Sequence, residues 1–184
     1  KFDYLDTFGF KEITKFEINK KYGLINNQGK IILAPKYDEI TTFHTSFSIV
    51  KLNGKYGLID KNGKEIVSLK YDSLGFFDDI LVTHINGKYG AINMNNNTLL
   101  EAKYDEVKPL SKTVFVVSEN KLSYLINPKL NIKKEIKGNF MNPDLKITTK
   151  SNMDMLQNLL EMFALDNNGE YPQDIQDLLR EANK

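Results

Sequence analysis

KYGLINNQGKIILAPKYDEI, residues 21–40, is one copy of a unit that the chain repeats. Related stretches begin at Lys55, with KYGLIDKNGKEIVSLKYDSL, and at Lys88, with KYGAINMNNNTLLEAKYDEV, so the spacings are 34 and 33 residues. A divergent copy, KLSYLINPKLNIKKEI, begins at Lys121. Self-similarity at a fixed period of this length predicts a repeat protein whose neighbouring units share a hydrophobic core.

The chain opens halfway through a repeat. KFD at residues 1–3 matches KYD at residues 36–38, and apolar residues follow both at matching positions. We therefore expect the natural protein to continue upstream of Lys1.

Each repeat has the turn residues of a β-meander. The Asn-Gly pairs at residues 53–54 and 86–87 lie between two strand-like runs, as in two-residue hairpins that need positive φ. The next connections, residues 26–29 and 60–63, end in glycine, which suits a turn closed by a left-handed residue. The predicted unit is a three-stranded antiparallel meander.

Glycine also recurs inside a strand, at Gly23, Gly57 and Gly90. Glycine weakens a strand unless a bulge or a neighbouring aromatic ring needs the space. We interpret these glycines as packing positions, and close approach of a ligand is the alternative.

Glu17, Lys51 and His84 occupy one position in successive repeats, on the strand before each KYG. Their neighbours, such as Val50 and Leu52, alternate with them and are apolar, so the two sets belong to opposite faces. We predict that Glu17, Lys51 and His84 meet water and contact a partner.

A Tyr-Asp pair recurs at residues 37–38, 71–72 and 104–105. We expect the ring to pack between repeats and the carboxylate to accept hydrogen bonds from a following turn. The alternative is a periodic binding ladder. The lysine that begins each KYG is expected to be a solvated residue beside a turn.

Composition and charge exclude several classes of function. The chain has 184 residues, of which 41% are hydrophobic and 27% charged, enough for a sizeable core. The 25 basic and 24 acidic residues nearly cancel, and Arg180 is the only arginine, so we expect no nucleic-acid partner. No apolar run is long enough to span a membrane.

Metal sites and cofactors are also not expected. The sequence contains no cysteine, which excludes disulfides and thiolate ligands. The two histidines, His44 and His84, occupy different places in the repeat, so their spacing supports neither a metal pair nor an acid-base dyad. No phosphate-binding glycine loop or nucleophile motif occurs.

The repeats resemble the WG repeat family of bacterial proteins, also called KWG repeats. The resemblance rests on the lysine, aromatic, glycine, Leu-Ile core, on the turn glycine and on the Tyr-Asp pair, and it extends from Lys1 to about Ile136. Tyrosine stands at Tyr22, Tyr56 and Tyr89 where the family name implies tryptophan. The resemblance implies an all-β module that mediates protein interactions, without known enzyme chemistry.

The sequence after the repeats changes character. Residues 1–138 are assigned to the repeat array of a half repeat, three full repeats and one degenerate repeat, and residues 139–150 to a linker. Apolar residues at helical spacing then predict a helical hairpin over residues 151–184. Within it, LQNLLEMFALDNNGEYPQDIQDLL resembles the helix and loop of type IV pilins and type II secretion pseudopilins.

The predicted fold class is therefore mainly β, with three-stranded antiparallel meanders in an open solenoid-like array and a C-terminal helical hairpin. We favour an open array over a propeller because a propeller blade has four strands in about 40–45 residues. The predicted function is a non-catalytic scaffold for protein–protein interaction, with a bacterial cell-envelope or extracellular location. Two alternatives stay open: a cell-envelope module that binds glycan through tyrosines, and a non-catalytic part of a larger secretion or pilus-associated protein.

Overall fold

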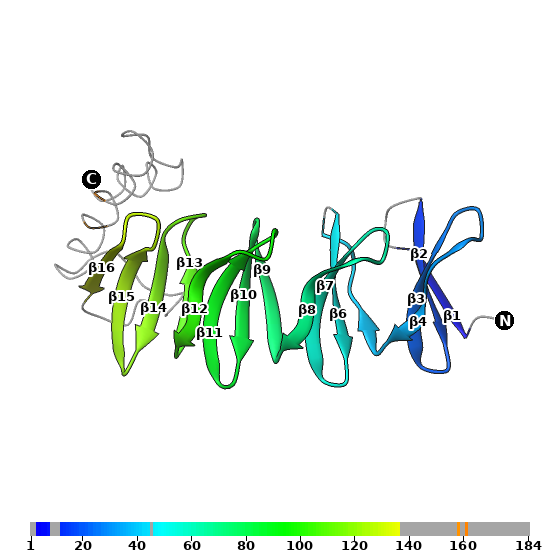
Figure 1. Cartoon of the computed structure of the whole chain (residues 1–184), viewed down its shortest axis with the longest axis horizontal. Coiled ribbons are helices and arrows are strands. Elements are labelled where there is room, and N and C mark those ends of the chain that lie inside the picture. Colours follow the sequence, from blue (N-terminus) through cyan, green and yellow to red (C-terminus); the bar gives the residue numbers. More distant parts are fainter. Residues whose placement is uncertain (1–2, 8–11, 45, 137–157, 159–160, 162–184) are drawn as a thin grey trace, which may run out of the picture. The chain divides into compact units, whose positions relative to one another are not determined.

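Four antiparallel β-sheets make up the described part of the chain (Figure 1). The computed structural model describes residues 3–7, 12–44, 46–136, 158 and 161. Each sheet has four strands, which are neighbours in space in the order in which they occur in the chain. The repeats therefore fold as the mainly β structure that their turns and strand patterns predict.

The first sheet comprises β1 (Tyr4–Thr7), β2 (Ile13–Ile18), β3 (Lys21–Asn26) and β4 (Ile31–Tyr37). The second comprises β5 (Glu39–Ile40), β6 (Phe47–Leu52), β7 (Lys55–Asp60) and β8 (Glu65–Tyr71). The third comprises β9 (Ser73–Phe77), β10 (Ile80–Ile85), β11 (Lys88–Asn93) and β12 (Thr98–Tyr104). The fourth comprises β13 (Glu106–Pro109), β14 (Phe115–Glu119), β15 (Leu122–Asn127) and β16 (Ile132–Ile136).

The predicted three-stranded unit is wrong, because each sheet has a fourth strand. The residues directly after a Tyr-Asp pair leave one sheet and become the first strand of the next. Glu39 and Ile40, for example, pair with Lys51 and Val50. One sequence repeat is therefore divided between two sheets. The open array was preferred over a propeller because three strands were expected in each unit, and the observed four strands remove that reason.

The prediction that the fold class includes a C-terminal helical hairpin is also wrong. Every element assigned among the described residues is a β-strand. The predicted linker, residues 139–150, and the predicted hairpin, residues 151–184, lie outside the described residues apart from Asn158 and Glu161.

The predicted hairpin turns are confirmed. Asn53 and Gly54 have φ of 51° and 78°, and Asn86 and Gly87 have 52° and 75°, so both residues of each turn are left-handed, as a type I′ hairpin requires. In the next connections Gly29 and its counterpart Gly63 have φ of 80° and 75° and close a turn to the first residue of the connection.

The packing role of the strand glycines is confirmed as well. A Cβ on Gly57 would lie 2.6 Å from the carbonyl oxygen of Val67, and a Cβ on Gly23 would lie 2.5 Å from that of Leu33. At Gly23 the ring of Phe16 is also within 2.9 Å. The pairing of β7 with β8 is irregular at this point, so the glycine makes room for a bulge in the partner strand.

The fourth sheet shows what happens without this glycine. Asn120 occupies the turn position of Asn53, so Tyr124, opposite Val117, stands where Gly57 stands opposite Val50. The strands β15 and β16 then pair in unbroken register. The divergent repeat thus aligns one residue later than its sequence suggested, with Leu122 at the place of the KYG lysine.

The chain divides into two compact units, one mainly of residues Lys1–Gly75 and the other including Thr98–Lys184. In the first unit, buried residues of the first sheet, such as Ile13 and Leu24, pack with Val50 and Ile59 of the second. In the other unit, Ile80, Ala91 and Leu100 pack in the same manner with Val107, Phe115, Val117 and Ile126 of the fourth sheet. Sheets thus stack face to face within each unit.

The prediction that one face of the strand before each KYG meets water is wrong for β6. Ser48, Ile49 and Val50 are consecutive residues of β6, and all three are buried. Consecutive residues of a strand point to opposite faces, so both faces are covered there. In β2, β6 and β10 the two residues before the hairpin turn are half-buried, and so are Thr14 and Lys15 of β2 and Val82 of β10.

Candidate functional site

An aspartate links successive sheets at three junctions, and we call each such group an Asp clasp. Each clasp contains a KYG lysine, the aspartate of a Tyr-Asp pair and the first residue of the following hairpin turn. The three clasps are Lys21, Asp38 and Asn53; Lys55, Asp72 and Asn86; and Lys88, Asp105 and Asn120.

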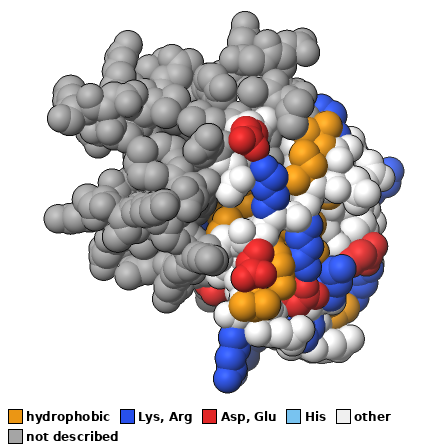
Figure 2. Space-filling view, turned by 90° about the vertical axis from the view of Figure 1, so that its left-hand side faces the viewer, with side chains coloured by type: hydrophobic (Ala, Val, Ile, Leu, Met, Phe, Trp, Pro, Cys, Tyr) orange, Lys and Arg blue, Asp and Glu red, His pale blue; other side chains and the backbone are white. Residues whose placement is uncertain are grey.

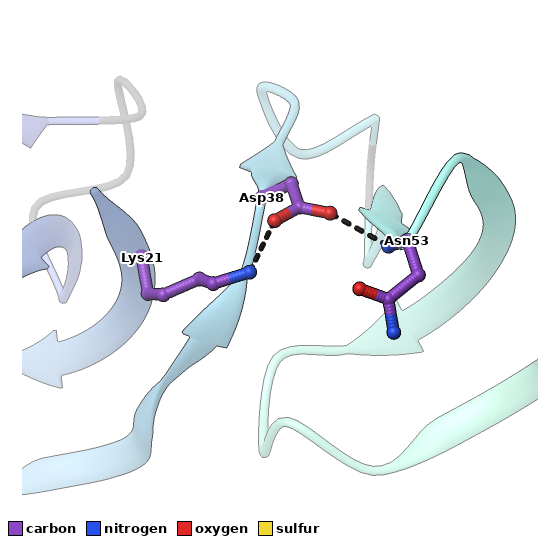
Figure 3. A network of polar contacts seen from close by, with 3 residues as sticks. All are labelled: Lys21, Asp38 and Asn53. Carbon is purple, nitrogen blue, oxygen red and sulfur yellow. Dashed lines mark hydrogen bonds and ion pairs between the residues drawn. The ribbon is translucent and has the colours of Figure 1, made fainter. Parts of the chain in front are cut away.

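The first clasp shows how the two carboxylate oxygens are used (Figure 3). Lys21, at the start of β3, donates a hydrogen bond to Oδ1 of Asp38. The backbone N–H of Asn53, in the turn between β6 and β7, donates to Oδ2 at 2.7 Å. The backbone N–H of Asp38 itself donates to the carbonyl of Lys51 at 2.8 Å. One residue thereby connects the first sheet to the hairpin of the second.

The geometry recurs with little change. The lysine-to-aspartate distance is 2.5 Å in both the second and the third clasp, and the turn N–H lies 2.9 Å from the other carboxylate oxygen in both. Asp3 makes the same bonds to the first hairpin, accepting from the N–H of Asn19 at 2.9 Å and donating to the carbonyl of Glu17 at 2.9 Å. Asp3 therefore occupies the place of a clasp aspartate, while the half repeat over residues 1–3 stays a prediction.

The surroundings of the clasp stabilise the charged form of the aspartate. Hydrogen bonding to the lysine is the main cause that lowers the pKa of Asp38, Asp72 and Asp105 below its usual value, and the turn N–H adds to it. The side chains are exposed by roughly two-fifths, so water screens these ion pairs and the clasp acts chiefly by orienting the hairpin.

These contacts settle two interpretations of the sequence. The expectation that the carboxylate accepts a hydrogen bond from a following turn is confirmed. The KYG lysine is solvated beside a turn, as expected, but it also pairs with the aspartate, which the sequence analysis did not predict. Lysine and aspartate are 17 residues apart in all three clasps, and this constant spacing is the signal that could have revealed the pair.

The tyrosines before the clasp aspartates are core residues, as expected. Tyr37 is 0% exposed, and Tyr71 and Tyr104 are 5% exposed. Among the described residues, the hydroxyl of Tyr37 is the buried side-chain atom that has no hydrogen-bond partner. Burial of these rings leaves little of them for a periodic ligand-binding ladder.

The residues predicted to bind a partner share one structural position. Glu17 in β2, Lys51 in β6 and His84 in β10 are half-buried and lie near the hairpin turn of three successive sheets. The backbone carbonyl of each accepts the N–H of a clasp aspartate or of its counterpart Asp3. The prediction that they are equivalent is thus confirmed, whereas their role in binding stays a prediction.

Lysine side chains cover the tyrosines opposite this position. Glu17 is paired with Tyr22, and Lys51 with Tyr56. Lys15 Nζ lies 5.0 Å from the ring centre of Tyr22, and Lys51 Nζ lies 5.0 Å from that of Tyr56, within the range of a cation–π contact. Hydrogen bonding to Tyr56 raises the pKa of Lys51. An ammonium group therefore occupies one face of each of these two rings.

In the described residues, no three histidine, cysteine, aspartate or glutamate side chains gather to hold a metal ion. No helix of sufficient length and hydrophobicity to cross a membrane is found in that same part of the chain.

Stacked four-stranded sheets, repeated turns and repeated Asp clasps define a β-repeat scaffold. The family described as WG containing repeat matches residues 22–56, 56–88 and 89–122. These matches extend over more than half of the chain, so the chain belongs to this family. They end before residue 123, and the pilin-like resemblance of the C-terminal segment, most of which lies outside the described residues, is not supported.

Comparison with other proteins adds little beyond the family. No curated protein matches the sequence. Among solved structures, Kluyveromyces lactis Hsv2 is similar at 10% identity and a TM-score of 0.39, over 72% of this chain and 50% of that one. The N-terminal domain of Nup159 is similar at 13% identity and a TM-score of 0.41, over 79% and 47% of the two chains. The chain thus spans about half the length of these structures.

Proposed function

We propose that the chain is a non-catalytic scaffold that binds another protein through the hairpin surface, meaning Glu17, Lys51 and His84 in three successive sheets. The observation that carries the proposal is the combination of a constant backbone with variable side chains. An aspartate N–H holds the carbonyl of this residue in each of the first three sheets, while the side chain is acidic in the first, basic in the second and an imidazole in the third. Such an arrangement suits recognition of one extended partner by several repeats.

The partner is proposed to be a protein and not a glycan stacked on tyrosines. Sugar rings stack on exposed aromatic faces, and lysines lie over Tyr22 and Tyr56 here. Charged and imidazole side chains instead suit polar and ionic contacts across a protein interface.

The test compares three full-length chains. The surface variant carries Glu17→Lys, Lys51→Glu and His84→Ala, which leaves the formal net charge unchanged. The control variant carries Lys64→Glu, Glu65→Lys and Ser68→Ala, three exposed positions away from the hairpin surface, with the same balance of charge.

Immobilised parent, surface variant and control are exposed to the same cell extract, and bound proteins are identified by mass spectrometry. We expect at least one protein that the parent and the control retain and the surface variant loses. Equal retention by all three would place the interaction elsewhere. Unfolding curves of the three chains establish that the variants are folded.

A glycan is a second candidate ligand, at a different place. A cleft of about 570 Å³ lies in the first unit, within the size range of small-molecule sites. Its lining consists of amide and charged side chains together with two isoleucines: Glu12, Ile13, Asn26, Asn27, Gln28, Ile32, Lys61 and Asn62. If neutral oligosaccharides bind there, Asn27→Ala and Asn62→Ala should weaken binding in calorimetric titrations, and the surface variant should not.

A further inference from the structure

In the first and third sheets, one face packs against the sheet that follows. The fourth sheet has a corresponding face. In the first sheet Leu24 and its cross-strand neighbour Leu33 pack in the core shared with the second sheet. Ala91 and Leu100 are the equivalent pair in the third sheet and pack in the core shared with the fourth. The corresponding pair in the fourth sheet is Leu125 and Lys134, which we take to define its outer face.

This outer face is buried. Leu125 is 0% exposed, Val116, its neighbour in β14, is 2% exposed, and Ile136 is 5% exposed. Asn127, on the same face, is also fully buried. The described residues contain no strand after β16. Something other than a further sheet of the described fold therefore covers these side chains.

Two residues from later in the chain contact the face. Lys134 Nζ donates to Oδ1 of Asn158 at 3.0 Å and to Oε2 of Glu161 at 2.7 Å. Figure 2 views the molecule from the left-hand side of Figure 1. Lysine and acidic side chains of the described residues lie close to hydrophobic ones on the surface seen there. We propose that the segment containing Asn158 and Glu161 covers the outer face of the fourth sheet and caps the repeat array.

Lys134 selects this cap over another repeat. Where Lys134 stands, the earlier sheets have Leu33, Val67 and Leu100. A further sheet would present apolar side chains like Val50 and Ile59 to this position and would bury the ammonium group without a partner, which is costly. The carboxylate of Glu161 and the amide oxygen of Asn158 supply the acceptors that a repeat lacks.

The position of the cap can be tested with the full-length chain by a water-soluble carbodiimide, which joins an amine and a carboxylate in direct contact. We expect an amide link between Lys134 and Glu161 within one chain, found by peptide mass mapping. The pair Lys133 and Glu119, 2.6 Å apart within the sheet, provides an internal standard. The variant Glu161→Gln should lose the first link and keep the second.

Two results of the cross-linking would overturn the proposal. In one, the standard pair links and Lys134 with Glu161 does not. In the other, a mixture of isotope-labelled and unlabelled protein shows the link between chains, which would assign the face to the segment of a second copy.

Thiol labelling tests whether the cap shields the face, because the chain has no cysteine of its own. We expect Val116→Cys to react far more slowly than an exposed control, Ser68→Cys. Adding Glu161→Lys should speed the reaction of Val116→Cys roughly two- to fivefold, the range for one exposed ion pair, and should leave Val50→Cys unchanged. Exchanging the charges, with Lys134→Glu as well, should restore the slow rate.

Labelling of Val116→Cys at the rate of Ser68→Cys would refute a cap over this face. An unchanged rate after Glu161→Lys would contradict the role given to Lys134.

Discussion

Replacing Gly57 by alanine adds a single methyl group at the place where β8 bulges toward β7. The new Cβ would lie 2.6 Å from the carbonyl oxygen of Val67, and ordinary contacts begin at 3.4 Å, so the backbone of β8 has to move by about 0.8 Å. The obstacle is main chain, so no rotamer change relieves it. Overpacking of this kind costs about 1–3 kcal/mol, so Gly57→Ala should lower the free energy of unfolding of the chain by that amount.

Gly75 provides the matched control, because it also lies in a strand but has no atom within 4 Å of its Cβ position. Alanine is favoured over glycine in a strand by about 0.5–1 kcal/mol, so Gly75→Ala should leave stability unchanged or raise it.

Urea unfolding at a fixed temperature gives the free energy of unfolding of both variants, and thermal melts should agree, at about 2–4 °C per kcal/mol for a chain of this length. Equal stability of Gly57→Ala and Gly75→Ala would refute the packing role. Weakened partner binding with unchanged stability would instead assign Gly57 to a ligand site.

Three further predictions concern stability. Tyr37→Phe should raise the free energy of unfolding by about 1–2 kcal/mol, because it removes a buried hydroxyl without a partner, and a clear loss in urea unfolding would mean that the hydroxyl is bonded. Lys121→Gly should raise the free energy of unfolding by about 0.5–1 kcal/mol, because Lys121 has a φ of 67° where the second and third hairpins have Gly54 and Gly87, and a lower melting temperature would contradict this reason. The clasp aspartates have a lowered pKa in the folded chain. Their contribution to the free energy of unfolding is therefore complete when the pH is above the usual pKa of 3.8, and it is lost as the pH falls from there through the lowered pKa. Between pH 6 and pH 3 the parent should therefore lose more stability than a variant with all three changed to asparagine, and an equal loss would count against the clasp.

The elements that sequence alone predicted are those set by local chemistry. Two-residue Asn-Gly turns need left-handed backbone, and the φ values of Asn53 and Gly54 show it. A glycine inside a strand weakens the strand unless a neighbouring group needs the space. At Gly57 the bulge of the neighbouring strand needs it. Both features depend on residues close together in the sequence, which is why the repeat pattern was sufficient to find them.

What sequence did not predict depends on contacts between repeats. The strand at Glu39 and Ile40 is two residues long, and it exists because it pairs with β6 of the same sheet. Alternation of polar and apolar residues suggested that one face meets water, but the consecutive residues Ser48, Ile49 and Val50 of β6 are all buried. The pairing of Lys21 with Asp38 required comparison of the spacing across all three repeats, because neither residue is unusual by itself.

Several repeats are proposed to contact one partner through the hairpin surface. The most direct test is calorimetric titration of a protein captured by the parent chain against three single variants, Glu17→Lys, Lys51→Glu and His84→Ala. Each of these variants, which lie in three different sheets, should weaken binding, while Glu65→Lys should not. Loss of affinity in only one variant, or in none, would contradict recognition by successive repeats.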